Sequence, residues 1–239
     1  NADADITALY SNGTTTSFSG IANTNVYVWP GDTYTPGGTT SLSTTNGSLY
    51  VYGTMNAAAN SVSMGGSFYV DNAGTFTHTG NLTFNGSTSV TYNQGDDPIT
   101  SNVIVSSTFN TAPTPGIRVT TNPMSVNNLT INGGTNYLSL VGNNLTVGGT
   151  FSNNGNLYLR GNETTTLTQD IDSGTWVYTG DGDTTADSFT IKDFGATDYF
   201  NLTVLSTDGP TDAFSLGATM GIGTNMKMLG GGVIASIYT

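Results

Sequence analysis

Three aspartates in a short glycine-containing segment have the spacing of a cation-binding loop. Asp181, Asp183 and Asp187 lie in "DGDTTAD". Carboxylates at nearby positions of one loop can direct several oxygens at a single point, and oxygen is the ligand that Ca²⁺ prefers. The segment begins like an EF-hand loop but lacks that loop's glycine and closing glutamate. Two interpretations stay open: a calcium site, which Asp170 and Asp172 of "TQDID" would join if the fold brings them close, and a solvated acidic corner.

Paired carboxylates and the single histidine are the other candidates for chemistry. Glycoside hydrolysis needs two carboxylates that flank the scissile bond, and Asp96 with Asp97 in "GDDP", or Asp181 with Asp183, offer such pairs. The basic residues are scattered, so no basic groove accompanies either pair. His78 in "TFTHTG" has no Gly-x-Ser-x-Gly segment to join in a Ser-His-Asp arrangement, and we expect it to face solvent between two threonines. The sequence therefore predicts no catalytic site, no enzyme and no cofactor other than calcium.

Glycans enter the interpretation in two ways. Twelve Tyr, ten Phe and two Trp either fill the interior and subunit contacts or include an outward strip on which sugars stack. Asn-x-Ser/Thr triplets are also acceptors for N-glycosylation in a host able to attach glycans, although a chain so rich in Asn, Thr and Ser contains many by chance. The candidates are Asn12, Asn46, Asn81, Asn85, Asn128, Asn144, Asn162 and Asn201.

Composition restricts the classes of protein. Only 8% of the 239 residues are charged, against roughly 25% in an average soluble domain, yet 36% are hydrophobic, so we expect a folded chain. The net charge of -12 repels phosphate backbones and argues against a nucleic-acid partner. There is no cysteine, and no run approaches the roughly 18 apolar residues of a membrane helix. The opening "NADADITALY" fits a secreted protein whose signal peptide has been removed, and equally a fragment.

Short alternating runs predict an all-β protein. Segments such as "SLYVYG", "NVIVSSTF" and "NLTVGGTF" are rich in β-branched and aromatic residues and are separated by Gly, Asn or Asp. These separators suit positive φ, which serves either type I′ hairpin turns or the corners of a parallel solenoid. The one mildly helical segment, "GTMNAAANSVSM" (53–64), has the composition of a poor helix.

Repeated wording favours the solenoid. "MGGSF" (64–68) matches "VGGTF" (147–151) at an offset of 83, and 80–94 matches 155–169 at an offset of 75. A drifting offset is typical of stacked coils, because one coil cannot bury its apolar face alone and insertions loop out at corners. We therefore expect a parallel β-solenoid (β-helix) with inward apolar ladders and outward Thr, Ser and Asn ladders. An antiparallel β-sandwich or jelly roll is the alternative.

Several segments also resemble known repeats. "NNLTINGG" (127–134), "NNLTVGGTFSNNGNLYLRGN" (143–162) and the stretch from "DYFNLTV" to "KMLGGG" (198–232) are similar in style to the repeats of large bacterial and archaeal cell-surface proteins that form right-handed β-helices and act as adhesins. The likeness covers about residues 64–232 and brings no catalytic or ligand motif with it. The resemblance implies a secreted, repetitive protein with a structural or adhesive role.

These observations give one overall prediction. Residues 1–45 form an irregular N-terminal cap or docking segment, and residues 46–239 form the repetitive solenoid. The uncharged apolar ending "GGGVIASIYT" leaves a strand edge that recruits another copy, which predicts a head-to-tail homopolymer. The predicted function is a non-enzymatic extracellular structural protein, either a filament or layer subunit or an adhesin segment. The alternatives are a carbohydrate-active β-helix hydrolase or lyase and a carbohydrate-binding module, with surface glycans as partners.

Overall fold

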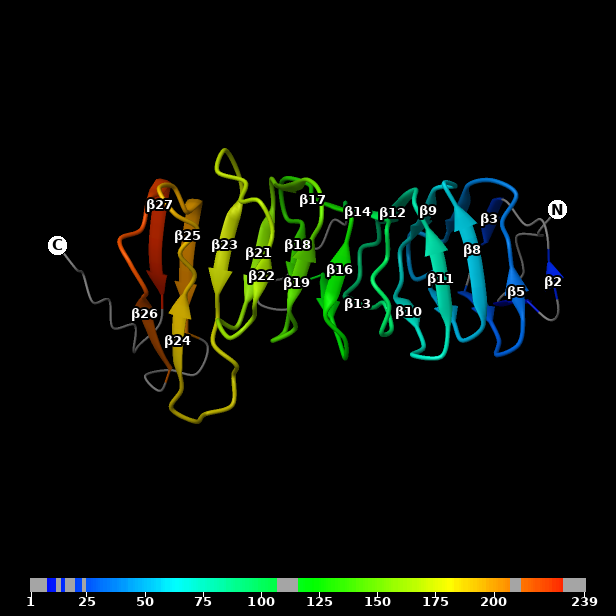
Figure 1. The fold of residues 1–239 in the computed structure, drawn as a ribbon, viewed down its shortest axis with the longest axis horizontal. Helices are drawn as coiled ribbons and strands as arrows, with labels where there is room; N and C mark the ends of the chain where they lie inside the picture. Colours follow the sequence, from blue (N-terminus) through cyan, green and yellow to red (C-terminus); the bar gives the residue numbers. More distant parts are fainter. Residues whose placement is uncertain are drawn as a thin grey trace.

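The chain folds into a rod of stacked β-coils (Figure 1). The computed structural model describes residues 8–11, 14–15, 20–22, 25–106, 116–206 and 212–229. Within these ranges all regular elements are strands, none is a helix that could cross a membrane, and every strand pair is parallel. The prediction of a parallel β-solenoid is confirmed. The sandwich alternative is wrong, because each strand bonds to the coils before and after it rather than to a hairpin partner.

Sheet A forms one face of the rod along the whole described length. Each of its strands pairs with the sheet A strand of the next coil, so the sequence order runs along the rod from β2 to β27 in Figure 1. Its eleven strands are β1 (Ala8–Ser11), β4 (Asn25–Val28), β7 (Leu49–Val51), β10 (Phe68–Val70), β13 (Val90–Asn93), β15 (Ile117–Val119), β18 (Tyr137–Ser139), β21 (Asn156–Leu159), β23 (Thr175–Tyr178), β25 (Tyr199–Leu205) and β27 (Ile222–Leu229).

The other faces are built from shorter sheets. Sheet B contains β2 (Thr14–Thr15), β5 (Thr33–Tyr34), β8 (Thr54–Ala58) and β11 (Thr75–His78). Sheet C contains β3 (Gly20–Ala22), β6 (Thr40–Leu42), β9 (Val62–Met64), β12 (Asn81–Phe84), β14 (Asn102–Val105), β17 (Asn128–Ile131) and β20 (Phe151–Asn153). Sheet D contains β16 (Met124–Val126), β19 (Leu145–Val147) and β22 (Thr165–Thr166), and sheet E contains β24 (Ser188–Ile191) and β26 (Ala213–Leu216).

The core is a set of inward rows that run from coil to coil. Val26, Leu49, Phe68 and Tyr92 are consecutive register partners in sheet A, and all are almost completely buried. Strand alternation places inward residues between outward ones, as the burial patterns of β4 and β7 show. Burying a side chain of this size contributes about 1.5–3 kcal/mol. A single coil could not do this, because its inward row is covered only by the rows of its neighbours.

Polar ladders run along the outside. The Asn102 side chain donates to Asn81 Oδ1 (3.2 Å) and accepts a hydrogen bond from Asn128 Nδ2 (2.7 Å). These three residues are register partners in β12, β14 and β17 of sheet C. Further along the rod, Asn225 donates to Asn201 in the same way (3.0 Å). The expected outward asparagine ladders are therefore present.

The two matched segments occupy different corners. Residues 64–68 lead from β9 of sheet C into β10 of sheet A, whereas residues 147–151 lead from β19 of sheet D into β20 of sheet C. Their glycines meet similar demands: a Cβ at Gly65 would collide with the backbone of Thr44, and one at Gly149 with the Asn128 side chain. True coil lengths vary. Leu49 pairs with Phe68, 19 residues on, and Val90 with Ile117, 27 residues on.

The expected boundary at residue 45 does not mark a change of fold. Strands β4, β5 and β6, between Asn25 and Leu42, pair in parallel with β7, β8 and β9 and belong to the same three sheets. The mildly helical segment 53–64 forms β8 and β9. Residues 1–7 and the ending 230–239, on which the prediction of an open terminal strand rested, lie outside the described residues.

Candidate functional site

The acidic loop between β23 and β24 brings its three aspartates together. Oxygen atoms of Asp181, Asp183 and Asp187 all lie within 4.8 Å of one another. Asp181 and Asp187 are half-buried and Asp183 is exposed. Two positive φ angles, at Gly182 (81°) and Thr184 (71°), fold the loop back on itself, and Asp183 Oδ1 accepts a hydrogen bond from Thr185 N (2.7 Å). The residues predicted from spacing thus form a cluster whose oxygens suit a hard cation.

A fourth carboxylate lies beside this loop and was not predicted. Asp212 is completely buried, and a Cβ at Gly180 would collide with its Oδ2. The residue arrives from the next coil, where Ala213 N donates to Asp187 O (2.8 Å) and β26 pairs with β24. Only the register of coils separated by about 25 residues, Ser188 with Ala213, brings it here. Carboxylates held this close raise one another's pKa unless a cation offsets their repulsion.

Asp170 and Asp172 do not belong to this cluster. Asp170 Oδ2 accepts a hydrogen bond from Asn153 N (2.7 Å) and its Oδ1 accepts one from Asp172 N (3.2 Å). Burial raises the pKa of Asp170. Because β20 is the last described strand of sheet C, the Asp170 carboxylate satisfies a backbone donor at that open edge. Its role is therefore to cap a strand rather than to bind a metal.

His78 is buried, and the expectation that it faces solvent is wrong. Its Nε2 lies 2.7 Å from Asn60 O and its Nδ1 lies 2.6 Å from Ser101 Oγ. A carbonyl oxygen can only accept, so Nε2 carries the hydrogen and Nδ1 accepts from Ser101. Thr75 and Thr77 are the outward residues of β11, so Phe76 and His78 share the inward face. Burial lowers the pKa of His78, and its complete enclosure gives a substrate no access.

Asp96 and Asp97 lie in an exposed turn after β13. Asp96 Oδ1 accepts a hydrogen bond from Asn122 Nδ2 (3.4 Å). The Asp97 carbonyl accepts one from the buried Gln94 side chain (3.0 Å), and Gln94 Oε1 also accepts from Ser125 N (2.8 Å). The turn is thus fastened to the next coil by Gln94, a residue that the sequence analysis did not single out.

The glycosylation candidates differ in what their amides do. Asn128 and Asn201 both donate Nδ2 hydrogens, to Asn102 and to Gly174 O (2.8 Å), and Nδ2 is the atom to which an N-glycan is attached. Asn85 is half-buried. Asn12 lies outside the described residues. The exposed candidates are Asn46, Asn81, Asn144 and Asn162.

An aromatic strip covers the outer side of sheet A near its N-terminal end. It consists of Tyr27, Trp29, Tyr50, Tyr52 and Tyr69, hereafter the aromatic strip. Tyr27 and Tyr50 are register partners with ring centroids 4.8 Å apart and planes 9° apart. Trp29 and Tyr52 stack at 5.4 Å and 15°, and Tyr69 closes the set at 44° to both Tyr50 and Tyr52. Sequence reasoning considered such a strip but could not assign its members without the coil register.

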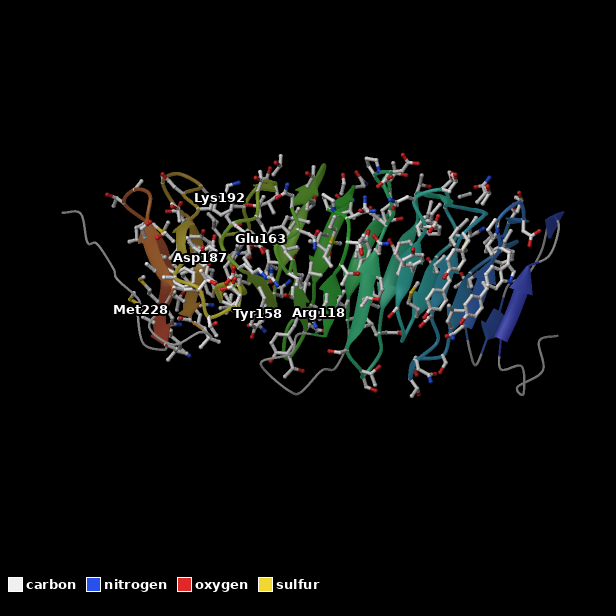
Figure 2. All side chains as sticks on the ribbon, turned by 90° about the horizontal axis from the view of Figure 1, so that it is seen from below. Arg118, Tyr158, Glu163, Asp187, Lys192 and Met228 are labelled. Atoms are coloured by element: carbon white, nitrogen blue, oxygen red, sulfur yellow. The ribbon has the colours of Figure 1, made fainter. Side chains whose placement is uncertain are left out.

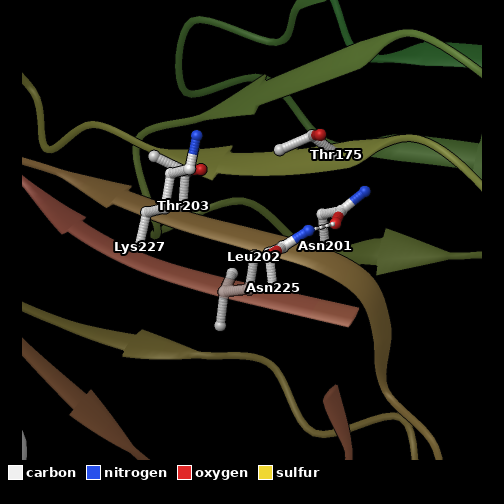
Figure 3. Close-up of a pocket in the computed structure, with 6 residues that line it drawn as sticks. All are labelled: Thr175, Asn201, Leu202, Thr203, Asn225 and Lys227. Atoms are coloured by element: carbon white, nitrogen blue, oxygen red, sulfur yellow. Dashed lines mark hydrogen bonds between the residues drawn. The ribbon is translucent and has the colours of Figure 1, made fainter. Parts of the chain in front are cut away.

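The other end of sheet A combines polar ladders with exposed methionines. Figure 3 shows a hollow of about 250 Å³ on its outer side, where Asn225 donates to Asn201 and Lys227 lies alongside. On β27 the side chains of Met226 and Met228 are 42% and 40% exposed. Their register partners Leu202 and Val204 are fully buried, so the two methionines continue an inward row at the last described coil. Figure 2 labels Met228 on this end strand.

Comparison with known proteins gave no assignment. No protein-family model, no curated protein and no solved structure matches the chain.

Proposed function

We propose that this chain is a non-enzymatic extracellular structural protein, a subunit of a cell-surface filament or layer or a segment of an adhesin, whose copies stack head to tail. The single observation that supports the proposal most is the end strand β27. Its inward row of Met226 and Met228 is exposed, and sheet A has no described strand beyond it. Strand edges with unpaired backbone groups recruit other strands.

The parallel arrangement of sheet A makes a second copy a suitable partner. In a parallel sheet the two end strands, β1 and β27, present opposite edges with the same chain direction. A second copy displaced along the rod axis would place its β1 beside β27 and continue the sheet. Such a contact joins two different surfaces and repeats without closing, which builds an open filament. Few charged residues guard the edges.

The extracellular assignment rests on the resemblance of the repeats to cell-surface proteins. Hydroxyl and amide ladders give the rod a polar surface with little charge. A carbohydrate-active enzyme is the competing class, because Asp96 with Asp97 and Asp181 with Asp183 offer carboxylates near the surface. Turnover of neutral or acidic polysaccharides that Asp97→Asn or Asp183→Asn abolishes would defeat the structural proposal.

Negative-stain microscopy and light scattering over a range of concentrations test the stacking. We expect rods of variable length but constant width. The variant Met226→Glu/Met228→Glu places charges in the inward row of β27 and should leave monomers. Lys227→Ser is the matched control, because Lys227 lies on the same strand but faces outward beside Thr203, and it should still polymerise. A wild-type chain that stays monomeric at every concentration contradicts the proposal.

A further inference from the structure

The aromatic strip is not required by the packing of sheet A. In later coils the corresponding outward face carries Asn156, Thr175, Asn201 and Asn225 as one row of register partners. Amides and hydroxyls therefore suffice to cover this face. Yet β4, β7 and β10 place rings there, and Trp29 is 41% exposed. A contiguous exposed aromatic surface on a polar protein marks a binding site.

The rings combine apolar surfaces with polar tips. The Tyr69 hydroxyl donates to Asp71 Oδ2 (3.3 Å) and Asn25 Nδ2 donates to the Tyr27 hydroxyl (3.3 Å). Desolvation raises the pKa of Tyr52 and Tyr69, so these phenols stay protonated and can donate hydrogen bonds at neutral pH. Aromatic side chains of this kind pack against apolar C–H surfaces while their tips bond to hydroxyls. Sugar rings present both.

Charge narrows the class of sugar. The first 117 residues contain no Lys or Arg, and Asp71 lies at the edge of the strip, where its carboxylate accepts from Tyr69. A second carboxylate, that of Asp32, follows Trp29 in a turn closed by a bond from Asp32 N to Trp29 O (3.0 Å). This environment repels uronates, sulfated glycans and nucleic acids. It accepts neutral sugars, whose hydroxyls can donate to the carboxylates.

The shape of the surface narrows the ligand to a chain. The strip lies on the outer side of three consecutive coils, and coils are spaced at about 4.8 Å. The hollows on the described surface lie elsewhere, around Asn201 and around Asp170. A single sugar unit would therefore make few contacts, whereas a polymer can make the same shallow contact at several units and gain affinity through multivalency.

We propose that the aromatic strip binds neutral, extended polysaccharide chains, which lie along the rod axis over Tyr27, Tyr50 and Tyr69 and are clamped at the side by Trp29 and Tyr52. This binding is independent of head-to-tail stacking, since the strip and β27 lie at opposite ends of sheet A.

Tryptophan fluorescence gives a site-specific readout. The chain has two Trp, of which Trp29 is 41% exposed and Trp176 is 1% exposed, so iodide quenching reports on Trp29. Cellohexaose, β-1,4-mannohexaose and chitohexaose are the probes, with the corresponding disaccharides and alginate for comparison. We expect at least one hexasaccharide to protect Trp29 from iodide and to bind at least about tenfold more tightly than its disaccharide. Alginate should give no protection.

Matched variants locate the binding. Tyr52→Ala and Trp29→Ala should each weaken hexasaccharide binding in calorimetry by about tenfold. Tyr158→Ala is the control, since Tyr158, labelled in Figure 2, is an aromatic residue of sheet A outside the strip and pairs edge-to-face with Tyr137. Unchanged Trp176 fluorescence confirms that the variants fold. Three results would overturn the proposal: no hexasaccharide bound at millimolar concentration, equal loss in Tyr158→Ala, or protection of Trp29 by rising protein concentration alone, which assigns the strip to a lateral contact between copies.

Discussion

Replacing His78 by alanine tests the reading of this residue as part of the core. The imidazole supplies one hydrogen bond to Asn60 O and receives one from Ser101, and it packs 5.3 Å from the Phe76 ring. His78→Ala leaves a buried hydroxyl and a carbonyl without these partners, at about 1–3 kcal/mol each, and opens a small cavity. The free energy of unfolding should fall by about 3–5 kcal/mol, and the melting temperature by roughly 10 °C.

Urea and thermal unfolding followed by far-UV circular dichroism measure this loss, and pH supplies a second signature. Because burial lowers the His78 pKa below its ordinary value of 6.5, the neutral form is favoured in the folded state. The contribution is complete above pH 6.5 and is lost as pH falls from 6.5 through the folded-state pKa. His78→Gln should remove this slope. A His78→Ala variant within about 1 kcal/mol of wild type, or a slope that His78→Gln retains, would refute the buried hydrogen-bonded histidine.

Two further perturbations test a corner and the acidic loop. Gly174→Ala places a Cβ against the backbone of Asn153 at a φ of 68°, and should destabilise the chain by more than about 3 kcal/mol. Gly31→Ala, where φ is 85° but no atom lies within 4 Å of the Cβ, should cost only about 1 kcal/mol; equal losses in urea unfolding would contradict the collision. For the acidic loop, we expect millimolar Ca²⁺ to raise the melting temperature, EDTA to reverse the rise, and Asp183→Asn to abolish it, whereas no response to Ca²⁺ or chelator returns the loop to a solvated corner.

The class of fold was predictable because its local rules are written in each strand. Alternation in segments such as β12 and β17, with glycines at corners where a Cβ would strike the preceding coil, leaves few other architectures. The long repeat that supported the prediction, however, was not a coil. Its two copies lie at different corners, and they look alike because each corner imposes the same demand for a small residue followed by an inward aromatic.

The candidate site was predictable only where it is local. Asp181, Asp183 and Asp187 meet within one loop, whereas Asp212 joins them from the next coil. Because coil lengths range at least from 19 to 27 residues, no fixed period aligns one coil with the next. For the same reason the register of Tyr27, Tyr50 and Tyr69 could not be derived from spacing. His78 was misplaced by a different error, since the phase of alternation was assigned from the two threonines rather than from buried Phe76.

The direction of the backbone hydrogen bonds gives the rod a particular mechanical response. In sheet A these bonds run along the long axis, perpendicular to the strands (Figure 1). Tension applied between the two ends would therefore open the ladder one coil at a time, like a zipper, rather than shear many bonds at once. A coil occupies about 4.8 Å of the rod. The 19 residues from Leu49 to Phe68, once released, span about 65 Å at roughly 3.4 Å per residue, so each yielding coil would lengthen a loaded rod more than tenfold locally and absorb a pull while its neighbours stay folded.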